Sequence, residues 1–343
     1  MPWWETENIM KKNKLKYFLI AFIGIALASV FIYAIADKKD DELAYRSHFF
    51  RDYRIYSPAV PEKADFAGEA APLDLFYVKE GLDREIMATT FMQSSTIMMF
   101  KRAYRWFPVI EPILKKNRIP DDFKYLCVAE SNLSNVVSPS NAEGFWQFIK
   151  ATGTRYGLEI TEEVDERYNL EKATEAACEY FNSAYKIYGN WTLVAASFNR
   201  GTDGLSKALL NQRVSDYYDL YLNEETARYV FRIMAIKEIY NHPTKYGFFL
   251  REQDLYKPVP TYTVTVDTAV QDLPALASKL KVNYRVLREF NPWIRRYNLP
   301  NKSGKAYTMI LPKAGMTYLD SLPKPARESD RFYKDTLKIR QMH

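Results

Sequence analysis

The distribution of apolar and polar positions divides this 343-residue chain into four kinds of segment. Residues 17–36 are uncharged, residues 37–84 show no sustained period, residues 85–250 repeat apolar positions at helical spacing, and residues 260–313 begin and end with strand-like segments. Apolar positions three and four residues apart mark one face of a helix, whereas alternation marks a half-buried strand. The pattern predicts a mainly α-helical protein with a small mixed domain near its C-terminus.

The uncharged segment 17–36 is long enough to cross a bilayer. At about 1.5 Å per residue, a helix of about twenty residues spans roughly the 30 Å hydrocarbon layer. Lysines in residues 1–16 precede it, so the positive-inside tendency places those residues in the cytoplasm and everything after Asp37 outside. A cleavable signal peptide is the alternative, because Ala34-Ile35-Ala36 forms an A-x-A-like site. The length of the apolar run favours a retained transmembrane anchor.

The exported part is expected to begin with a linker and continue as a run of helices. Residues 37–84 mix charged residues, prolines and scattered aromatics, which is typical of a linker or of a strap on a domain surface. From Arg84 onward the apolar spacing becomes helical. The helices that the pattern predicts span residues 86–104, 107–116, 121–130, 147–154, 170–188, 191–199 and 224–241.

The segment 260–313 has the pattern of a small β-α-α-β unit. Residues 261–266 alternate polar and apolar side chains with the period of a half-buried strand. A first helix is opened by Asp272 as cap and Pro274 at an early position, and a second short helix holds Leu287. Residues 306–311 return to a strand, and residues 314–343 form a C-terminal tail.

Composition and charge narrow the class of protein. Hydrophobic residues make up 47% and aromatic residues 15% of the chain, which excludes a disordered protein. The net charge of +6 is spread along the sequence, so no nucleic-acid partner is expected. This charge favours an anionic partner such as a wall polymer or lipid headgroups.

Cys127 and Cys178 lie within helical patterns and are interpreted as buried free thiols, with a disulfide as the alternative. The three histidines are far apart, so neither a metal nor a cofactor is expected.

Glu130 lies in line with the apolar stripe of a predicted helix. Phe123, Leu126, Cys127 and Glu130 follow each other at the spacing of one helical face. An acid on a buried face, near a helix C-terminus, should have a raised pKa and deliver a proton near neutral pH. The alternative is a glutamate that reaches solvent or pairs with a lysine. The helix alone leaves both interpretations open.

The residues after Glu130 resemble the active-site segment of goose-type lysozymes and family 1 lytic transglycosylases. The pattern of that family is E-S, followed by S-x-x-x-A-x-G-[LFM]-x-Q. In this chain the matching residues stand at the same spacing and in the same order, as Glu130, Ser131, Ser138, Ala142, Gly144 and Gln147.

Further motifs of the family follow in order, and the resemblance is closest to its membrane-bound lytic murein transglycosylase D type. Residues 165–167 resemble a D-E-R turn, in which Asp165 and Arg167 are expected to pair, and residues 225–230 resemble an E-T-x-x-Y-V segment. The A-Y-N motif is Ser197-Phe198-Asn199 here, so a hydrogen bond from the tyrosine of relatives is missing. Glu143 is expected to face solvent. The resemblance implies a lysozyme-like all-helical catalytic domain over residues 85–250.

The β-α-α-β unit resembles a LysM module, which binds the N-acetylglucosamine-containing backbone of peptidoglycan or chitin. The G-D-T near the start of that family is Val266-Asp267-Thr268 here, and Asn291-Pro292 falls at its turn. The alternative interpretation is a structural appendage that no longer holds sugar.

The resemblance implies a peptidoglycan lytic transglycosylase in cell-wall remodelling, anchored in the inner membrane with its catalytic part in the periplasm or cell envelope. It implies cleavage of the β-1,4 bond between N-acetylmuramic acid and N-acetylglucosamine with formation of 1,6-anhydro-N-acetylmuramic acid. Glu130 is the implied acid and then base, because no second acid matches the motifs. The expected substrate-binding residues are Ser131, Ser138, Gly144, Gln147, Asn199 and Tyr229.

Several roles and alternatives accompany this interpretation. Tyr229 is expected to orient the carboxyl group of Glu130, while Phe145, Trp146, Tyr156 and Phe198 are candidate sugar-stacking faces, although at helical spacing an aromatic is more often core. Glycan strands and the membrane are the expected partners, and the sequence does not indicate an oligomeric state. The other functions left open are a non-catalytic peptidoglycan-binding scaffold and a lysozyme-type muramidase.

Overall fold

The computed structural model describes residue 47, residues 56–302 and residues 304–316. Nearly all of these residues belong to the compact unit that begins at Pro58. The predicted membrane segment 17–36 lies outside the described residues, as does the tail beyond residue 316. Within the described part, no helix is both long enough and apolar enough to cross a membrane.

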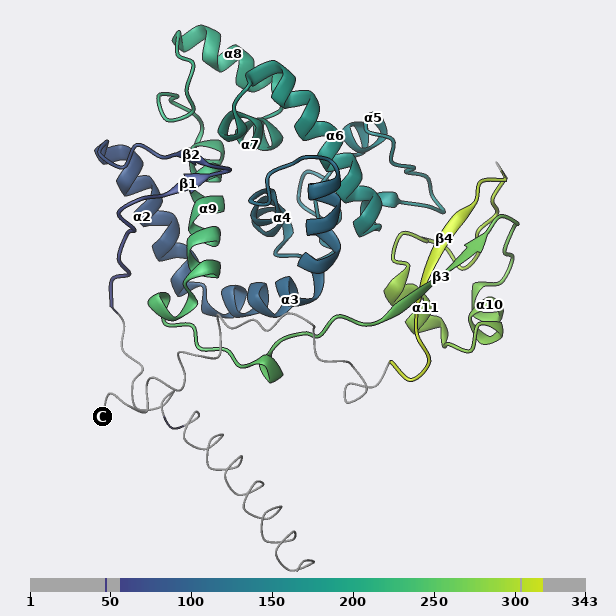
Figure 1. Cartoon of the computed structure of the whole chain (residues 1–343). Helices are drawn as coiled ribbons and strands as arrows, with labels where there is room; N and C mark the ends of the chain where they lie inside the picture. Colours follow the sequence, from purple (N-terminus) through teal and green to yellow (C-terminus); the bar gives the residue numbers. More distant parts are fainter. Residues whose placement is uncertain (1–46, 48–55, 303, 317–343) are drawn as a thin grey trace, which may run out of the picture. The chain divides into compact units, whose positions relative to one another are not determined.

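A helical domain follows a short N-terminal hairpin (Figure 1). Helix α4 lies in the middle of this domain, with α3, α6, α7 and α9 around it, and α2 runs beside α9. The elements are β1 (Asp65–Phe66), β2 (Glu69–Ala70), α2 (Phe76–Phe91), α3 (Gln93–Lys116), α4 (Phe123–Ser131), α5 (Lys150–Arg155), α6 (Leu170–Tyr188), α7 (Trp191–Arg200), α8 (Thr202–Gln212) and α9 (Glu224–Asn241), with short 3-10 turns at Glu166–Tyr168, Pro243–Tyr246 and Glu252–Asp254.

Helix α4 is enclosed on nearly every side. Phe123 packs against Phe181 of α6, with ring centroids 4.4 Å apart, and against Trp191 of α7 at 5.4 Å. The neighbouring Lys124 is also buried and is neutralised by Glu111 of α3, with Nζ and Oε1 2.9 Å apart. A helix that is buried all round is held in place by tertiary packing rather than by its own propensity. The position of its last turn, which carries Glu130, is therefore fixed by the core.

The structure corrects the prediction of separate helices at residues 86–104 and 107–116. Helix α3 continues through Pro108 and Pro112, and the break falls instead at Met92, whose φ of −77° and ψ of 50° are not helical. Each proline removes one intrahelical hydrogen bond. Packing outweighs that loss, because apolar side chains are buried on both sides of the prolines, namely Met99, Phe100, Ala103, Phe107, Ile110 and Leu114.

Other helix boundaries also differ from the sequence pattern. Part of the segment predicted as a linker or strap, residues 37–84, folds as the hairpin and the first half of α2, which buries Phe66 and Leu82 completely. Helix α5 begins at Lys150 rather than at Gln147, because Gln147 has a positive φ of 50°. Helix α8 was not predicted, since it buries only a narrow stripe, formed by Leu205 and Ala208.

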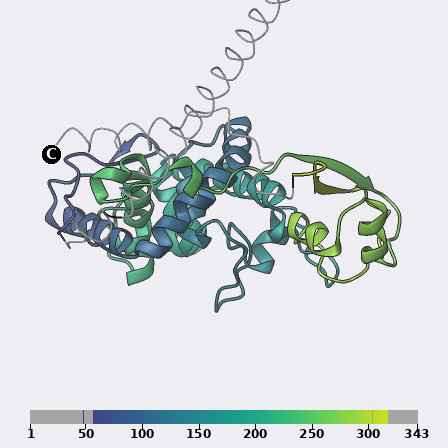
Figure 2. The ribbon, with the colours of Figure 1, turned by 90° about the horizontal axis from the view of Figure 1, so that it is seen from below.

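The predicted β-α-α-β unit is confirmed. It consists of β3 (Thr261–Val266), α10 (Leu273–Lys279), α11 (Tyr284–Phe290) and β4 (Tyr307–Pro312). The strands pair antiparallel, with Thr261 opposite Pro312 and Val266 opposite Tyr307, and Figure 2 shows both helices on one side of this sheet. Asp272 caps α10 as predicted, because its Oδ1 accepts a hydrogen bond from the backbone N–H of Ala275 at 2.9 Å.

The small domain is joined to the helical domain by backbone hydrogen bonds and an ionic cluster. The N–H of Asp165 donates to the carbonyl of Trp293 at 2.8 Å, and the N–H of Arg295 donates to that of Glu163 at 2.7 Å. Lys305 contacts Glu159, with Nζ and Oε2 2.7 Å apart. Residues 159–166 of the helical domain therefore supply contacts to the small domain.

Candidate active site

Glu130 and Tyr229 are in direct contact. Glu130 stands in the last turn of α4, and the hydroxyl of Tyr229, on α9, donates a hydrogen bond to its Oε1. Tyr229 is 2% exposed, whereas Glu130 is half-buried and so retains access to solvent. The contact that the sequence predicted between these two side chains is present in the structure.

The surroundings of Glu130 tune its pKa close to neutrality. The pKa of Glu130 is raised from 4.5 to about 7, chiefly by desolvation and also by the negative charge of Glu225. The hydrogen bond from Tyr229 and the positive charge of Arg232 oppose that shift. Burial and the neighbouring Glu130 raise the pKa of Tyr229 well above its usual value, so its hydroxyl remains a proton donor. A carboxyl group with a pKa of about 7 can both give and take a proton near neutral pH.

Gly144 allows the loop after α4 to pass close to the D-E-R turn. It adopts a φ of +81°, and a Cβ atom placed on it would lie 2.0 Å from the carbonyl oxygen of Arg167. Only glycine tolerates both the conformation and the contact. Three residues further on, Gln147 also has a positive φ, and its Nε2 donates to the carbonyls of Val136 at 3.0 Å and Gly144 at 2.7 Å.

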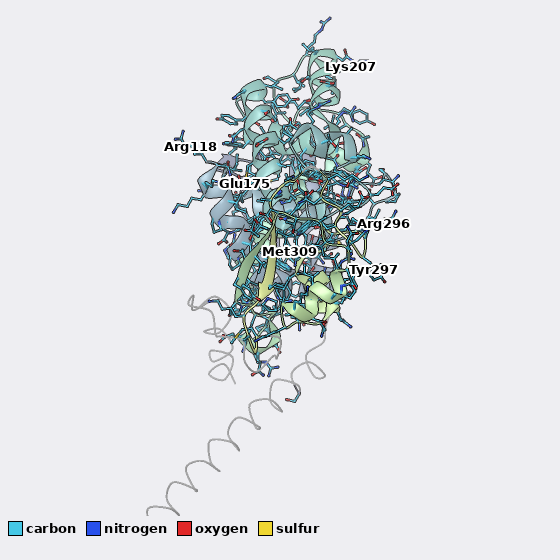
Figure 3. The ribbon with its side chains drawn as sticks, turned by 90° about the vertical axis from the view of Figure 1, so that its right-hand side faces the viewer. Arg118, Glu175, Lys207, Arg296, Tyr297 and Met309 are labelled. Carbon is cyan, nitrogen blue, oxygen red and sulfur yellow. The ribbon has the colours of Figure 1, made fainter. Side chains whose placement is uncertain are left out.

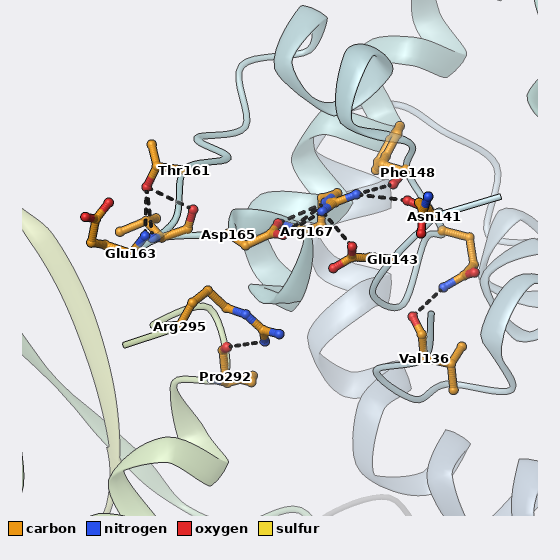
Figure 4. Close-up of polar contacts among 12 residues, drawn as sticks. Val136, Asn141, Glu143, Phe148, Thr161, Glu163, Asp165, Arg167, Pro292 and Arg295 are labelled. Carbon is orange, nitrogen blue, oxygen red and sulfur yellow. Dashed lines mark hydrogen bonds and ion pairs between the residues drawn. The ribbon is translucent and has the colours of Figure 1, made fainter. Parts of the chain in front are cut away.

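Arg167 fastens this loop to the turn. Its guanidinium pairs with Asp165, with Nη2 and Oδ2 2.6 Å apart, and with Glu143, with Nη2 and Oε1 3.0 Å apart. It also donates to the carbonyls of Asn141 and Phe148, both at 3.2 Å (Figure 4). The predicted pair of Asp165 and Arg167 is confirmed. The expectation that Glu143 faces solvent is wrong, because Arg167 reaches across the loop to its carboxylate.

Three of the expected substrate-binding residues hold the loop in its present shape. Ser131 is buried, and its hydroxyl donates to the carbonyl of Phe145 at 2.7 Å. The hydroxyl oxygen of Ser138 accepts from the N–H of Ala142 at 3.0 Å. Together with Gly144, these residues fix the course of the loop that follows Glu130.

Asn199 lies against the beginning of α9. Its Oδ1 accepts from the hydroxyl of Thr226 at 2.8 Å, and its Nδ2 donates to Glu225 at 3.4 Å. Thr226 and Tyr229 are three residues apart on α9, so they share one face of that helix. One helix therefore contacts both Asn199 of α7 and Glu130 of α4.

The aromatic candidates divide into core and partly exposed residues. Trp146 is fully buried and donates from its indole N–H to Thr174 at 2.9 Å, and Phe145 is 5% exposed, so neither offers a free stacking face. Phe198, the residue that departs from the family motif, is partly exposed and packs on the rings of Tyr180 and Phe181, with centroids 5.1 and 5.2 Å away. The tyrosine-to-phenylalanine departure thus leaves the ring packed within an aromatic cluster.

Sequence reasoning missed a second buried acid near the site. Glu85 of α2 is 1% exposed and accepts hydrogen bonds from Nε of Arg228 at 2.6 Å and from Nε of Arg232 at 3.5 Å, both on α9. It positions Arg232, whose charge acts on Glu130. The signal that singled out Glu130 was also present here, because Glu85 stands in line with the buried Leu82 and Ile86.

The thiols and potential metal ligands add no further chemistry to the site. Cys127 and Cys178 are both buried and free, so the disulfide alternative is wrong. Among the residues that the structure describes, no group of three or more His, Cys, Asp or Glu side chains is arranged to hold a metal ion.

Comparisons with known proteins agree with the arrangement of the two domains. Residues 107–220 match the family described as "Transglycosylase SLT domain", and residues 262–315 match "Soluble lytic transglycosylase C-terminal LysM-like domain". The chain is 28% identical over 215 residues to "Membrane-bound lytic murein transglycosylase D" of Escherichia coli K12, and equally to the protein of that name from an O6:H1 strain. These matches cover 61% of this chain and 47% of each relative, so the chain spans about half the length of the curated relatives it matches.

Proposed function

We propose that this chain, which carries an SLT transglycosylase domain followed by a C-terminal LysM-like domain, is a peptidoglycan lytic transglycosylase. It would cleave the β-1,4 bond between N-acetylmuramic acid and N-acetylglucosamine and leave a 1,6-anhydro-muramyl end. The observation that supports this activity best is Glu130, a single half-buried carboxyl group with a pKa of about 7 that is hydrogen-bonded to Tyr229. Substrate-assisted enzymes need only one carboxyl group of this kind.

In the first step, the protonated Glu130 gives its proton to the glycosidic oxygen while the bond from that oxygen to C1 of the muramyl ring breaks. The carbonyl of the muramyl 2-acetamido group stabilises the positive charge that develops at C1. Glu130 is left as a carboxylate, which the hydroxyl of Tyr229 and the charge of Arg232 stabilise, since both lower its pKa. The leaving strand departs with the transferred proton on its oxygen.

In the second step, the Glu130 carboxylate takes the proton from the muramyl 6-hydroxyl, whose oxygen attacks C1 and closes the anhydro ring. No water is consumed, and Glu130 returns to its protonated form for the next cycle. A pKa near neutrality suits both steps, because the same group must be a competent acid and then a competent base.

The remaining site residues divide into those that would meet substrate and those that shape the loop. Gln147 uses its amide N–H groups on two backbone carbonyls, so its amide oxygen is the group proposed to accept from the sugar. Asn199 is proposed to contact substrate beside α9. Ser131, Ser138 and Gly144 act through the shape of the loop.

We further propose that the protein works at the cell envelope. The matched relative is named as a membrane-bound protein, and residues 17–36 of this chain have the composition of a membrane anchor. Glycan strands are the proposed partner of the LysM-like domain. The domain limits proposed are residues 85–250 for the catalytic domain, extended at its start by α2, and residues 260–313 for the LysM-like domain.

Digestion of purified peptidoglycan distinguishes this function from its alternatives. We expect the detergent-solubilised full chain to release soluble muropeptides that carry anhydro-muramyl ends, identified by mass. Release of reducing-end products instead would indicate a muramidase. A protein that sediments with the peptidoglycan and releases no product would be the non-catalytic scaffold.

Tyr229→Phe is expected to move the alkaline limb of the pH profile to higher pH. The hydrogen bond from Tyr229 lowers the pKa of Glu130, so its removal raises that pKa further above 7. Because the first step needs protonated Glu130, kcat/KM falls as pH rises through this pKa, and the fall should come later in the variant. The maximal rate should drop about tenfold through loss of a hydrogen bond to a charged group.

Tyr188→Phe is the matched control, because its hydroxyl donates to the carbonyl of Thr202 at 2.9 Å, and Glu130 takes no part in that bond. We expect its pH profile to coincide with that of the wild type. An alkaline limb in Tyr229→Phe that stays in place or moves to lower pH would show that Tyr229 does not tune Glu130.

A further inference from the structure

A pocket of about 540 Å³ opens where the helical domain meets the LysM-like domain. One wall is Asn135, in the loop that follows Glu130, and the rest comes from α11 and the turn after it. Its lining residues are Asn135, Tyr284, Arg285, Arg288, Glu289 and Pro292. Both domains thus contribute to one cavity that lies a few residues along the chain from the proposed catalytic acid.

The two walls of this junction pocket are held together beside it. Trp293, which follows Pro292, accepts a hydrogen bond from the N–H of Asp165 at 2.8 Å. The guanidinium carbon of Arg295 lies 4.1 Å from the ring centroid of Tyr168, and its Nη1 donates to the carbonyl of Pro292 at 3.3 Å (Figure 4). The pocket therefore lies beside direct contacts between the two domains.

The charge that the pocket offers to a ligand is positive. Arg285 is exposed and forms no ion pair or hydrogen bond with the described residues. Arg288 donates from Nη1 to the hydroxyl of Tyr284 at 2.9 Å, but its Nε is buried and has no hydrogen-bond partner among them. A buried donor without a partner carries a cost that a bound acceptor would remove.

Among the described residues, Glu289 is the one acidic residue that lines the pocket, and it interacts with Arg105, which lies outside the pocket. Burial lowers the pKa of the Arg105 guanidinium on α3, and the negative charge of Glu289 is among the interactions that oppose this shift. The side chain of Arg105 in turn donates from Nε to the carbonyl of Lys257 at 3.0 Å, so it is held in place. Arg285 and Arg288 outnumber Glu289 among the lining residues, so the pocket carries a net positive charge.

We propose that the junction pocket binds the carboxylate-bearing stem peptide of the glycan strand on which Glu130 acts. Guanidinium groups bind carboxylates through paired, charge-assisted hydrogen bonds, which suits Arg285 and Arg288. The amide of Asn135 can both donate to and accept from a peptide backbone. This inference rests on the proposed function, because the peptide is attached to the muramyl residue whose bond is cleaved.

The aromatic wall of the pocket suits the aliphatic part of such a peptide. Tyr284 is stacked on Tyr297, with ring centroids 5.3 Å apart, and Tyr297 is 71% exposed at the surface of the LysM-like domain (Figure 3). Stacking on Tyr297, together with the Arg288 guanidinium 5.8 Å from the ring centroid, holds the Tyr284 ring in place as a rigid aromatic wall. The LysM-like domain then selects strands that carry peptides, in addition to any contact that it makes with sugar.

The test compares two substrates in the full-length protein. Glycan strands are used with their peptides and after enzymatic removal of those peptides, and kcat/KM is measured on both. We expect the ratio of kcat/KM for peptide-bearing over denuded strands to fall about tenfold in Arg285→Gln/Arg288→Gln. The control Lys279→Gln/Lys281→Gln removes two exposed positive charges of the same domain outside the pocket and should keep the wild-type ratio.

A ratio that is unchanged in the arginine variant, or that falls equally in the lysine control, would overturn the proposal. If the wild-type protein cleaves neither substrate, the proposed function fails. The proposal for the pocket is then tested by measuring the affinity of the protein for the two kinds of strand. Soluble peptide-bearing strands should bind the wild type about tenfold more tightly than the arginine variant, and denuded strands should show no such difference. Equal binding of the peptide-bearing strands by both proteins would overturn the proposal independently of catalysis.

Discussion

Glu130→Gln is expected to lower the rate of anhydro-muropeptide release by about a thousandfold, within the range that general acid–base groups contribute. The glutamine keeps the shape of the side chain and can still accept the hydrogen bond from Tyr229. It can neither protonate the leaving oxygen nor take the proton from the 6-hydroxyl. The measurement is the initial rate of soluble muropeptide release at neutral pH, with Glu179→Gln, an exposed acid on α6, as the matched control.

The free energy of unfolding, measured for the wild type and for Glu130→Gln, shows whether the variant has lost only its chemistry or also its fold. Because folding raises the pKa of Glu130 from 4.5 to about 7, the folded wild type binds more protons than the unfolded chain between these values. Its free energy of unfolding therefore falls, relative to that of Glu130→Gln, as the pH rises through this window. We expect the variant to be the more stable protein above pH 7. A variant that stays within tenfold of wild-type activity would remove Glu130 from the mechanism.

Gly144→Ala is expected to lower the free energy of unfolding by about 3 kcal/mol and to impair activity as well. The added Cβ would lie 2.0 Å from the carbonyl oxygen of Arg167, and the backbone at a φ of +81° disfavours any L side chain. The loop from Ser138 to Phe148 must then move away from the D-E-R turn, which breaks its ion pair through Glu143. Chemical denaturation measures the loss.

Gly157→Ala provides the matched control for this substitution. Its φ of +83° is nearly the same, but a Cβ atom there would meet nothing within 4 Å. The conformational strain alone should cost about 1 kcal/mol. Equal losses in the two variants would show that the approach of Gly144 to Arg167 does not limit stability.

The parts of the fold that the sequence predicted well are those with local signals. Helices α6 and α9 begin and end at the predicted residues, because their apolar period is sustained and Asn169 and Gly189 stand at the two ends of α6. The β-α-α-β unit was predicted equally well, from the alternation of polar and apolar residues in its first strand and from Asp272 as the cap of its first helix. The full length of α3 could not be predicted from the sequence, because its continuation through Pro108 depends on packing against the rest of the domain.

In the candidate site, too, features with a local sequence signal were predicted, whereas features that depend on residues distant in sequence were not. The apolar face of α4 singled out Glu130, and the resemblance to the family motifs implied its contact with Tyr229, although 99 residues separate them. The partner of Glu143 could not be predicted, because nothing in the local sequence shows that Arg167 reaches the loop. Glu85 was missed although it stands on an apolar stripe, because its partners Arg228 and Arg232 come from a helix that is distant in sequence.

Digestion in ¹⁸O-labelled water tests the central claim most directly, because it follows the atom that attacks C1. If Glu130 activates the muramyl 6-hydroxyl, the muropeptides released by the wild-type protein will carry anhydro-muramyl ends and no label from the solvent. Label at C1 of the released muramyl residues would show that water is the nucleophile. That result would contradict the account and make the protein a muramidase.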